Sequence, residues 1–204
     1  MKDANLWPME KRAPQKRRQE TRAKLIAAAE AIIATDGFSG LRVEDVVARA
    51  QVAKGTFFSH FADKDRLMAL IIGQEMERIL GQMADAPPPT DIDTFAVRLA
   101  PLMDYMAQDR FVFDVVMRFS GAGAIETTEL ISHNFMRQVE LFVTWIYALQ
   151  GTVIRTDVDP VLLAEGIQAF AVQAMALKLC ALDNTNKSHE RLVTYLKPWL
   201  AAPK

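Results

Sequence analysis

Cysteine, histidine and glycine-rich segments are scarce in this chain of 204 residues, and each scarcity excludes a class of chemistry. The single cysteine, Cys180, has no second thiol with which to form an intramolecular disulfide. Three histidines, His60, His133 and His189, lie far apart and make no spacing typical of a metal site. The sequence also has no glycine-rich phosphate loop and no nucleophile motif. We therefore expect a protein without metal, cofactor or catalytic activity.

Long apolar runs are missing as well. No uninterrupted apolar run approaches the ~18 residues that are needed to span a bilayer. The first residues are polar and basic, with no apolar stretch behind them, so they do not resemble a secretory signal. Half of the residues are hydrophobic, which is enough for a sizeable core in one domain or two small ones. We expect a cytoplasmic protein with no membrane partner.

Charge is distributed unevenly, although the net charge is only −1. The first 24 residues hold 8 basic and 3 acidic side chains, a charge of +5, whereas residues 67–204 hold 11 and 16, a charge of −5. A basic segment before an acidic body favours a polyanionic partner at one end. A tail that only keeps the protein soluble would have the same charge, so charge alone does not decide between the two.

Helical periodicity dominates the chain, without convincing β alternation or an internal repeat. Helix starts are marked by side chains that can cap, namely Asp63, Thr90 or Asp91, Asp109, Asp159 and Ser188. Gly37 ends the first helix, and the proline run 87–89 separates a small N-terminal bundle from a larger one. We expect an all-α fold of about nine helices, over roughly 22–35, 43–50, 54–61, 63–84, 90–107, 109–120, 126–150, 159–182 and 188–200.

The segment 43–60 holds two short helices that are joined by about three residues. Phe57 and Phe61 are four residues apart and face inward together, while Val52 fills the angle between the helices. Small or polar side chains are left outside: Lys54, Gly55, Thr56, Ser59 and His60. A short helix with such an outer face can enter a DNA major groove, and the pair describes a helix-turn-helix. The alternative is an ordinary pair of packed short helices.

A larger set of residues resembles the N-terminal domain of TetR-family transcriptional regulators, from about Thr21 to Leu67. The set comprises Ala28, Ala29, Gly37, Phe38, Val43, Glu44, Asp45, Val46, Ala48, Ala50, Val52, Lys54, Gly55, Thr56, Phe57, His60, Phe61, Lys64 and Leu67. This resemblance implies a basic flexible arm over 1–20, a helix-turn-helix DNA-binding domain over 21–67, and a ligand-binding and dimerisation domain over 68–204.

Three positions depart from the family pattern. Gln51 occupies the turn position where the family usually has glycine, and a left-handed backbone would cost it roughly 1 kcal/mol more. Ala53 replaces the usual serine cap of the recognition helix, a loss of about 1 kcal/mol. Phe58 replaces the usual tyrosine and can contact DNA only by apolar packing. These departures leave the details of DNA contact open.

The resemblance implies two kinds of DNA contact. Lys54, Gly55, Thr56 and Phe58 would lie toward the bases, while the remaining contacts would be to phosphate. The phosphate contacts would come from Ser59, His60, Lys64, Arg17, Arg18 and Arg22. For His60 the alternative is a partly buried structural histidine, and for Phe58 it is a place in the core.

The resemblance also implies a homodimer through residues 159–182 and 188–200, and a ligand pocket in the larger domain. The first of these segments is apolar on nearly all sides, so it must be buried in its own domain or against a second subunit. Methionine and aromatic residues are frequent between 103 and 175, which favours an apolar or aromatic ligand, although ordinary core packing uses the same residues. The candidate ligand contacts are Met103, Met106, Phe113, Met117, His133, Phe135, Arg137, Gln168 and Gln173.

We therefore expect a ligand-responsive repressor that binds a palindromic operator in double-stranded DNA as a homodimer. One alternative is a helical small-molecule-binding or adaptor protein with a degenerate helix-turn-helix. A second alternative is an all-α enzyme that uses a cavity in the larger domain. Salt-sensitive binding to DNA separates the first hypothesis from both alternatives.

Overall fold

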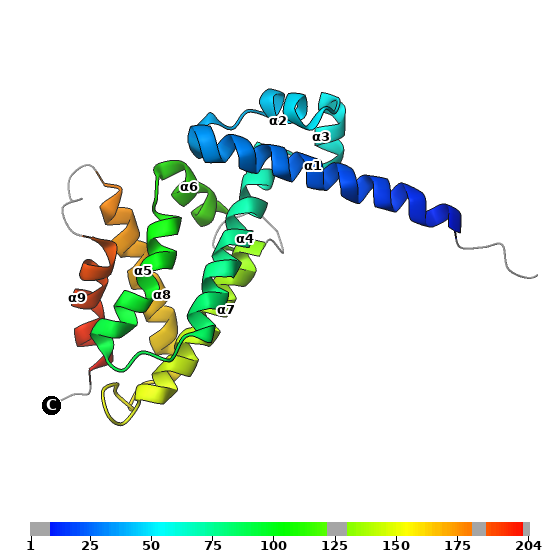
Figure 1. The fold of residues 1–204 in the computed structure, drawn as a ribbon. Helices are drawn as coiled ribbons and strands as arrows, with labels where there is room; N and C mark the ends of the chain where they lie inside the picture. Colours follow the sequence, from blue (N-terminus) through cyan, green and yellow to red (C-terminus); the bar gives the residue numbers. More distant parts are fainter. Residues whose placement is uncertain (1–8, 122–129, 181–186, 202–204) are drawn as a thin grey trace, which may run out of the picture. The chain divides into compact units, whose positions relative to one another are not determined.

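The computed structural model describes residues 9–121, 130–180 and 187–201, and every regular element in these ranges is an α-helix (Figure 1). The predicted all-α fold is thus confirmed. The described residues form nine helices: α1 Met9–Gly40, α2 Val43–Ala50, α3 Lys54–His60, α4 Lys64–Asp85, α5 Ile92–Met106, α6 Arg110–Phe119, α7 Leu130–Leu149, α8 Pro160–Lys178 and α9 Ser188–Leu200.

The chain divides into two compact units between Ile71 and Ile72, a point inside α4. The proline run 87–89 therefore lies within the second unit, in the connection between α4 and α5. One continuous helix thus begins in the first unit and ends in the second, so the two units share an element of secondary structure.

The first unit is built on α1, which packs on α2, while α2 packs on α3. Leu25 and Ala29 on α1 and Phe57 on α3 are fully buried, as the periodicity of these segments requires. Helical geometry is interrupted at Gly37, whose φ of 70° is in the region that glycine tolerates. Residues 9–20 of the expected arm belong to α1, and residues 1–8 lie outside the described part.

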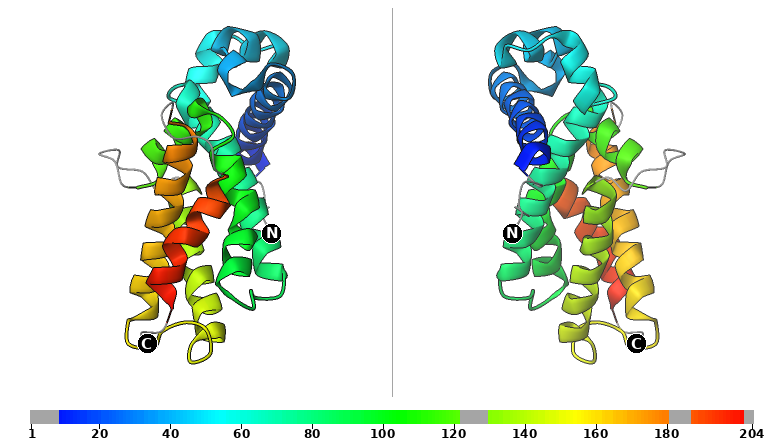
Figure 2. Two further views of the ribbon diagram at one scale, coloured as in Figure 1. Left: turned by 90° about the vertical axis from the view of Figure 1, so that its left-hand side faces the viewer. Right: turned by 90° about the vertical axis from the view of Figure 1, so that its right-hand side faces the viewer.

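In the second unit α5, α8 and α9 run alongside one another and α7 lies against α8 (Figure 2). The expected capping residues accept hydrogen bonds from amides in the first turns of α5, α6 and α8. Asp91 accepts a hydrogen bond from the Thr94 amide at 2.7 Å, Asp109 accepts from Val112 at 2.9 Å, and Asp159 accepts from Val161 at 2.7 Å.

Two expectations about the last helices are wrong. The helix that we expected to reach residue 182 ends at Lys178, with Leu179 as its C-cap; residues 181–186 lie outside the described part. Ser188 is the first residue of α9 rather than its cap, which is Lys187 without a side-chain hydrogen bond. The Ser188 hydroxyl is buried and lacks a partner among the described residues, so it contributes no capping bond.

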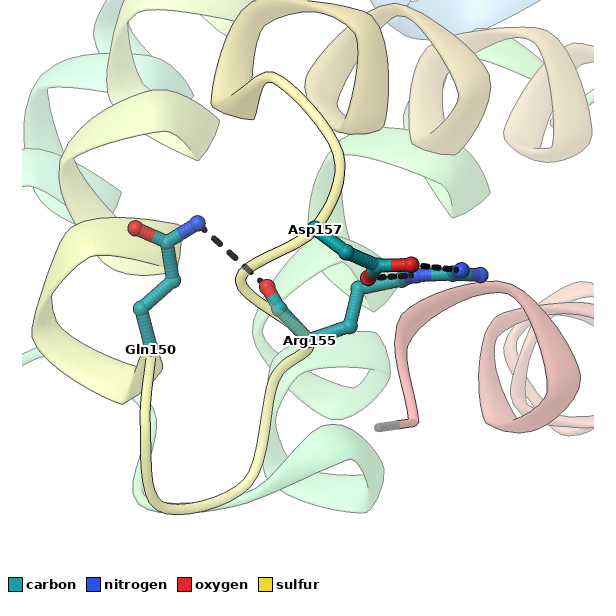
Figure 3. Close-up of polar contacts among 3 residues, drawn as sticks. All are labelled: Gln150, Arg155 and Asp157. Atoms are coloured by element: carbon teal, nitrogen blue, oxygen red, sulfur yellow. Dashed lines mark hydrogen bonds and ion pairs between the residues drawn. The ribbon is translucent and has the colours of Figure 1, made fainter. Parts of the chain in front are cut away.

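The loop between α7 and α8 is fastened by polar contacts (Figure 3). The Gln150 amide donates to the Arg155 carbonyl at 3.3 Å, and the Arg155 guanidinium pairs with the Asp157 carboxylate at 2.7 Å. The Arg155 amide donates to the Leu200 carbonyl at 2.8 Å. This loop therefore fixes the end of α9 as well as the connection from α7 to α8.

Helix α8 is long and apolar enough to cross a membrane by length and composition alone, although Glu165, Gln168 and Gln173 interrupt its apolar residues. A third of the apolar window is buried inside the second unit. The buried side includes Leu163, Ile167 and Met175, which pack toward the neighbouring helices. The apolar character of α8 thus serves packing on one side and leaves an apolar surface on the other.

Candidate DNA interface and effector groove

The turn between α2 and α3 has the left-handed geometry that the resemblance predicted at Gln51. Gln51 has φ 56° and ψ 45°, and it is the one non-glycine residue with positive φ among those the structure describes. Amides after the helix donate to the last carbonyls of α2, Gln51 to Ala48 at 3.2 Å and Val52 to Val47 at 3.0 Å. The turn is therefore formed despite the missing glycine.

Helix α3 is held on its support by phenylalanine. Phe57 is fully buried, and its ring lies 5.7 Å from that of Phe61, which is also buried. Phe58 meets Phe57 edge to face at 5.3 Å but remains 50% exposed. The side of Phe57 and Phe61 is thus the inner side, and Phe58 lies at its margin with half of its surface open to a partner.

The opposite side of α3 faces solvent. Lys54, Gly55 and Ser59 are exposed, whereas Thr56 is half-buried. A Cβ built on Gly55 would meet no atom within 4 Å, so packing inside the chain does not require a glycine at this position. The space above Gly55 is open to an incoming backbone or base.

Lys54 begins α3 after an N-cap, Ala53, that offers no side-chain hydrogen bond. The Lys54 ammonium donates to the Glu44 carboxylate on α2 at 2.6 Å, with both side chains more than half exposed. This hydrogen bond and the charge of Lys54 lower the pKa of Glu44. An acidic side chain on α2 is therefore bound to the first basic side chain of the recognition helix.

Arg22 connects α1 to the end of α3. Its guanidinium donates to the His60 carbonyl at 3.1 Å and lies 4.4 Å above the centre of the Phe61 ring. A hollow of about 270 Å³ is lined by Arg22, Arg18, His60, Gln15 and Gln19, so five donor-bearing side chains surround it. Burial, then the charges of Arg18 and Arg22, lower the pKa of His60. This hollow has the charge and the donors to receive an anion.

Two more of the predicted phosphate contacts are Arg17, within α1, and Lys64, at the start of α4. Arg17 is exposed on α1, and its carbonyl accepts a hydrogen bond from the Thr21 hydroxyl at 2.9 Å. Lys64 is the first residue of α4, whose cap Asp63 accepts from the Arg66 amide at 2.8 Å. Free amides at a helix N-terminus favour anions, which agrees with the role expected for Lys64.

In the second unit a groove of about 630 Å³ runs between the end of α6, α7 and α8. It brings together three of the predicted ligand contacts, Met117, Phe135 and Gln168. The Gln168 amide donates to the Phe135 carbonyl at 2.9 Å and so joins α8 to α7. The other side chains that line the groove are Ser120, Gly121, Ser132, Met136, Val139, Glu165, Ala169 and Val172.

The structure does not bring the other candidate ligand contacts to this groove. Met103 and Met106 are buried in the core on α5, and Phe113 is half-buried on α6. His133 on α7 is exposed. Gln173 on α8 is exposed too, and the Arg137 guanidinium lies 3.5 Å from the Glu77 carboxylate on α4.

Sequence reasoning missed two buried amides on α7. Asn134 is 1% exposed and Gln138 is 3% exposed, and each has a polar atom without a hydrogen-bond partner in the part of the chain that is described. An unpaired buried amide costs about 1–3 kcal/mol. The signal in the sequence is an amide pair four residues apart on a helix whose other inward positions are apolar.

Acidic, histidine and cysteine side chains do not gather into a group of three that could hold a metal ion within the described ranges. Cys180 is a half-buried free thiol. The described residues therefore offer two sites with functional geometry, the exposed polar side of α3 and an apolar groove.

A tight turn between two short helices, an outward polar face on the second and a basic hollow beside it define a helix-turn-helix DNA-binding protein with a second helical unit. Residues 25–71 match the family model for bacterial regulatory proteins of the tetR family. The chain is a TetR-family transcriptional regulator.

Several relatives and solved structures are similar to this chain. The HTH-type transcriptional repressor DhaR of Mycobacterium sp. (strain GP1) is 26% identical over 155 residues, which cover 72% of this chain and 77% of DhaR. The HTH-type transcriptional regulator CymR of Pseudomonas putida is 33% identical over 86 residues, 40% of this chain and 42% of CymR.

Two solved structures share the fold. RolR in complex with resorcinol has a TM-score of 0.66 at 18% identity, with 92% of this chain and 91% of RolR covered. Thermus thermophilus FadR in complex with lauroyl-CoA has a TM-score of 0.63 at 15% identity, with 87% of this chain and 92% of FadR covered. At these identities the likeness establishes the fold.

Proposed function

We propose that this regulator is a ligand-responsive repressor that binds a palindromic operator as a homodimer. The observation that carries the proposal is the outer face of α3, where Lys54, Gly55 and Ser59 are open to a partner while Phe57 is fully buried. A helix held from behind and polar in front fits a DNA major groove. The relative DhaR is named a transcriptional repressor, which favours repression over activation.

Base contacts come from Lys54, Gly55, Thr56 and Phe58 in this proposal. Ser59, His60 and Lys64, with Arg17, Arg18 and Arg22 of α1, contact phosphate. Arg22 has an additional task, because its bond to the His60 carbonyl fixes the end of α3 on α1. The DNA-binding domain over 21–67 then reads bases with one helix and holds the backbone with α1 and α4.

Dimerisation uses the segments 159–182 and 188–200. Val161 and Leu162 are 47% and 52% exposed on α8, and Ala169 is exposed on the same helix. A half-buried aromatic cluster continues this surface, with the Phe170 ring 5.5 Å from Tyr195 and 5.7 Å from Trp199 on α9. Covering these apolar side chains with a second copy removes them from water. Two recognition helices about 34 Å apart can then read two half-sites.

The effector binds in the second unit, within residues 68–204. The groove beside α7 offers about 630 Å³ and is lined largely by apolar side chains, among them Met117, Phe135 and Val139. RolR and FadR were solved with resorcinol and lauroyl-CoA, so an aromatic or long apolar ligand agrees with this lining. A coupling of roughly 1–3 kcal/mol between effector and DNA is the usual scale.

Electrophoretic mobility shift with the DNA that flanks the gene tests the proposal. We expect a shift that weakens by about 10³-fold or more between about 50 and 200 mM salt, as several phosphate contacts require. Lys54→Ala with Thr56→Ala should abolish the shift, while Gln82→Ala, at an exposed position of α4, should leave it unchanged. A protein that shifts no flanking DNA at the lower salt would instead support the adaptor hypothesis.

A further inference from the structure

Two amide side chains interrupt the apolar inner face of α7. Asn134 and Gln138 are four residues apart and hence on the same side of the helix, and both are more than nine-tenths buried. The inward positions around them are otherwise apolar: Ile131, Phe142, Trp145, Ile146 and Leu149. The pair therefore places hydrogen-bonding groups inside the core of the second unit, away from the exposed side of α7.

One polar atom of each of these two amide side chains has no hydrogen-bond partner among the described residues. The Asn134 nitrogen Nδ2 donates to the Gly73 carbonyl of α4 at 2.7 Å, which fixes the oxygen Oδ1 as the free end of that side chain. Oδ1 of Asn134 and Nε2 of Gln138 are both buried and have no partner among the described residues. One free atom is thus an acceptor and the other a donor, and the two do not bond each other.

The two free atoms are complementary to one small polar group. A hydroxyl can donate to an amide oxygen and accept from an amide nitrogen at the same time, and a primary amide can do the same. Side chains one helical turn apart have Cβ atoms about 5–6 Å from each other, which one oxygen can bridge with two hydrogen bonds of about 2.8 Å. A carboxylate ion cannot donate, so it would leave Oδ1 of Asn134 unpaired.

We propose that Asn134 and Gln138 form a second ligand site, on the inner face of α7, for a hydroxyl or primary amide on a small, mainly apolar molecule. The inference goes beyond the proposed function, because neither residue lines the groove in which the effector is proposed to bind. The apolar body of the molecule packs among the aromatic side chains that follow on α7. Phe142 and Trp145 are the buried residues that follow Gln138 along α7, and their ring centres are 6.1 Å apart.

The Asn134 amide that receives this molecule also contacts α4. The two helices approach closely at this point, because a Cβ on Gly73 would lie 3.0 Å from the Leu130 Cβ and 3.3 Å from the Ile131 amide nitrogen. Since α4 continues into the first unit, a change at Asn134 acts on an element that both units share. Binding at Oδ1 and contact with the Gly73 carbonyl therefore depend on the orientation of a single side chain.

The test uses the full-length protein and ¹H–¹⁵N spectra of the side-chain amides, which Asn134→Leu and Gln138→Met assign by removing their signals. The probes are phenol, benzyl alcohol and benzamide, compared with the apolar molecules toluene, ethylbenzene and isopropylbenzene. We expect at least one polar probe to shift both amide signals and to bind about tenfold more tightly than its apolar counterpart. Gln138→Met should lose that preference, whereas Gln82→Met, at an exposed position of α4, should keep it.

Two results would overturn the inference. One is a set of amide signals that none of the polar probes moves, or a preference that Gln138→Met retains. The other is a clear fall in the Tm of Gln138→Met without probe, because this would mean that the amide has an internal partner. Mobility shift of each variant without probe is the separate check on the proposed function: operator binding that persists while probe binding fails rejects this inference alone.

Discussion

The Lys54 ammonium and the Glu44 carboxylate are 2.6 Å apart, so the recognition helix begins with a basic side chain that α2 already neutralises. Binding to DNA phosphate or to a base must separate this pair or leave Lys54 turned toward α2. Glu44→Gln should therefore strengthen operator binding and steepen the plot of log K against log salt by about one unit, since one more cation is free for DNA. Fluorescence anisotropy over a salt series measures both quantities.

Asp45→Asn is the matched control for that change, because it removes a neighbouring exposed charge on α2 that is not the ion-pair partner of Lys54. A slope that changes equally in the two variants would mean that general charge, and not the release of Lys54, controls affinity.

The left-handed turn at Gln51 predicts a gain in stability from glycine. At φ 56° a residue with a Cβ is strained by about 1–2 kcal/mol, and part of the relief is lost to the greater freedom of glycine in the unfolded chain. Gln51→Gly should raise the free energy of unfolding by about 0.5–1 kcal/mol in urea denaturation. Gly37→Ala, at φ 70° with open space around it, should lower it. Destabilisation by Gln51→Gly would show that the glutamine side chain holds the turn.

The sequence could predict features that depend on neighbouring residues, but not those that depend on contacts between helices. The bounds of α2 and the caps Asp91, Asp109 and Asp159 depend on neighbours within four residues, so local rules locate them. Burial of Gln138 and the pairing of Lys54 with Glu44 depend on helices that are brought together by the fold. The spacing of Asn134 and Gln138 among the apolar positions of α7 indicates that they share its inner side, but it does not indicate which of their polar atoms have partners.

The lowered pKa of His60 leads us to expect that DNA affinity depends on pH. Burial and the charges of Arg18 and Arg22 on α1 lower its pKa, so the imidazole is neutral at pH 7 in the free protein. A DNA phosphate in the hollow favours the protonated form, so binding takes up a proton and affinity should rise as pH falls below about 6.5. Anisotropy at constant salt between pH 5.5 and 8 measures this, and His60→Gln should remove the rise.

The stability of the free protein should change with pH in the opposite direction to its operator affinity. Because the folded-state pKa is lower than that of the unfolded chain, the unfolded state binds more protons as pH falls through both values, and His60 then opposes folding. Tm of the free protein should therefore fall over the range in which operator affinity rises, and this fall should be smaller in His60→Gln. Parallel changes of Tm and affinity in the wild type would contradict the assignment.

Gly166 on α8 lies against the Trp199 ring of α9, and this contact predicts the effect of one methyl group. A Cβ at Gly166 would lie 2.6 Å from Cε2 of Trp199, whose Nε1 donates to the Leu163 carbonyl at 3.2 Å. Gly166→Ala should therefore move the indole, weaken that hydrogen bond and lower the free energy of unfolding by about 1–3 kcal/mol. Gly81→Ala in α4 is the matched control: no atom lies within 4 Å of its Cβ, so it should stabilise the helix by about 0.5–1 kcal/mol. Urea denaturation and Trp emission follow both variants, and equal stability of Gly166→Ala and the wild type would mean that the indole adjusts without cost.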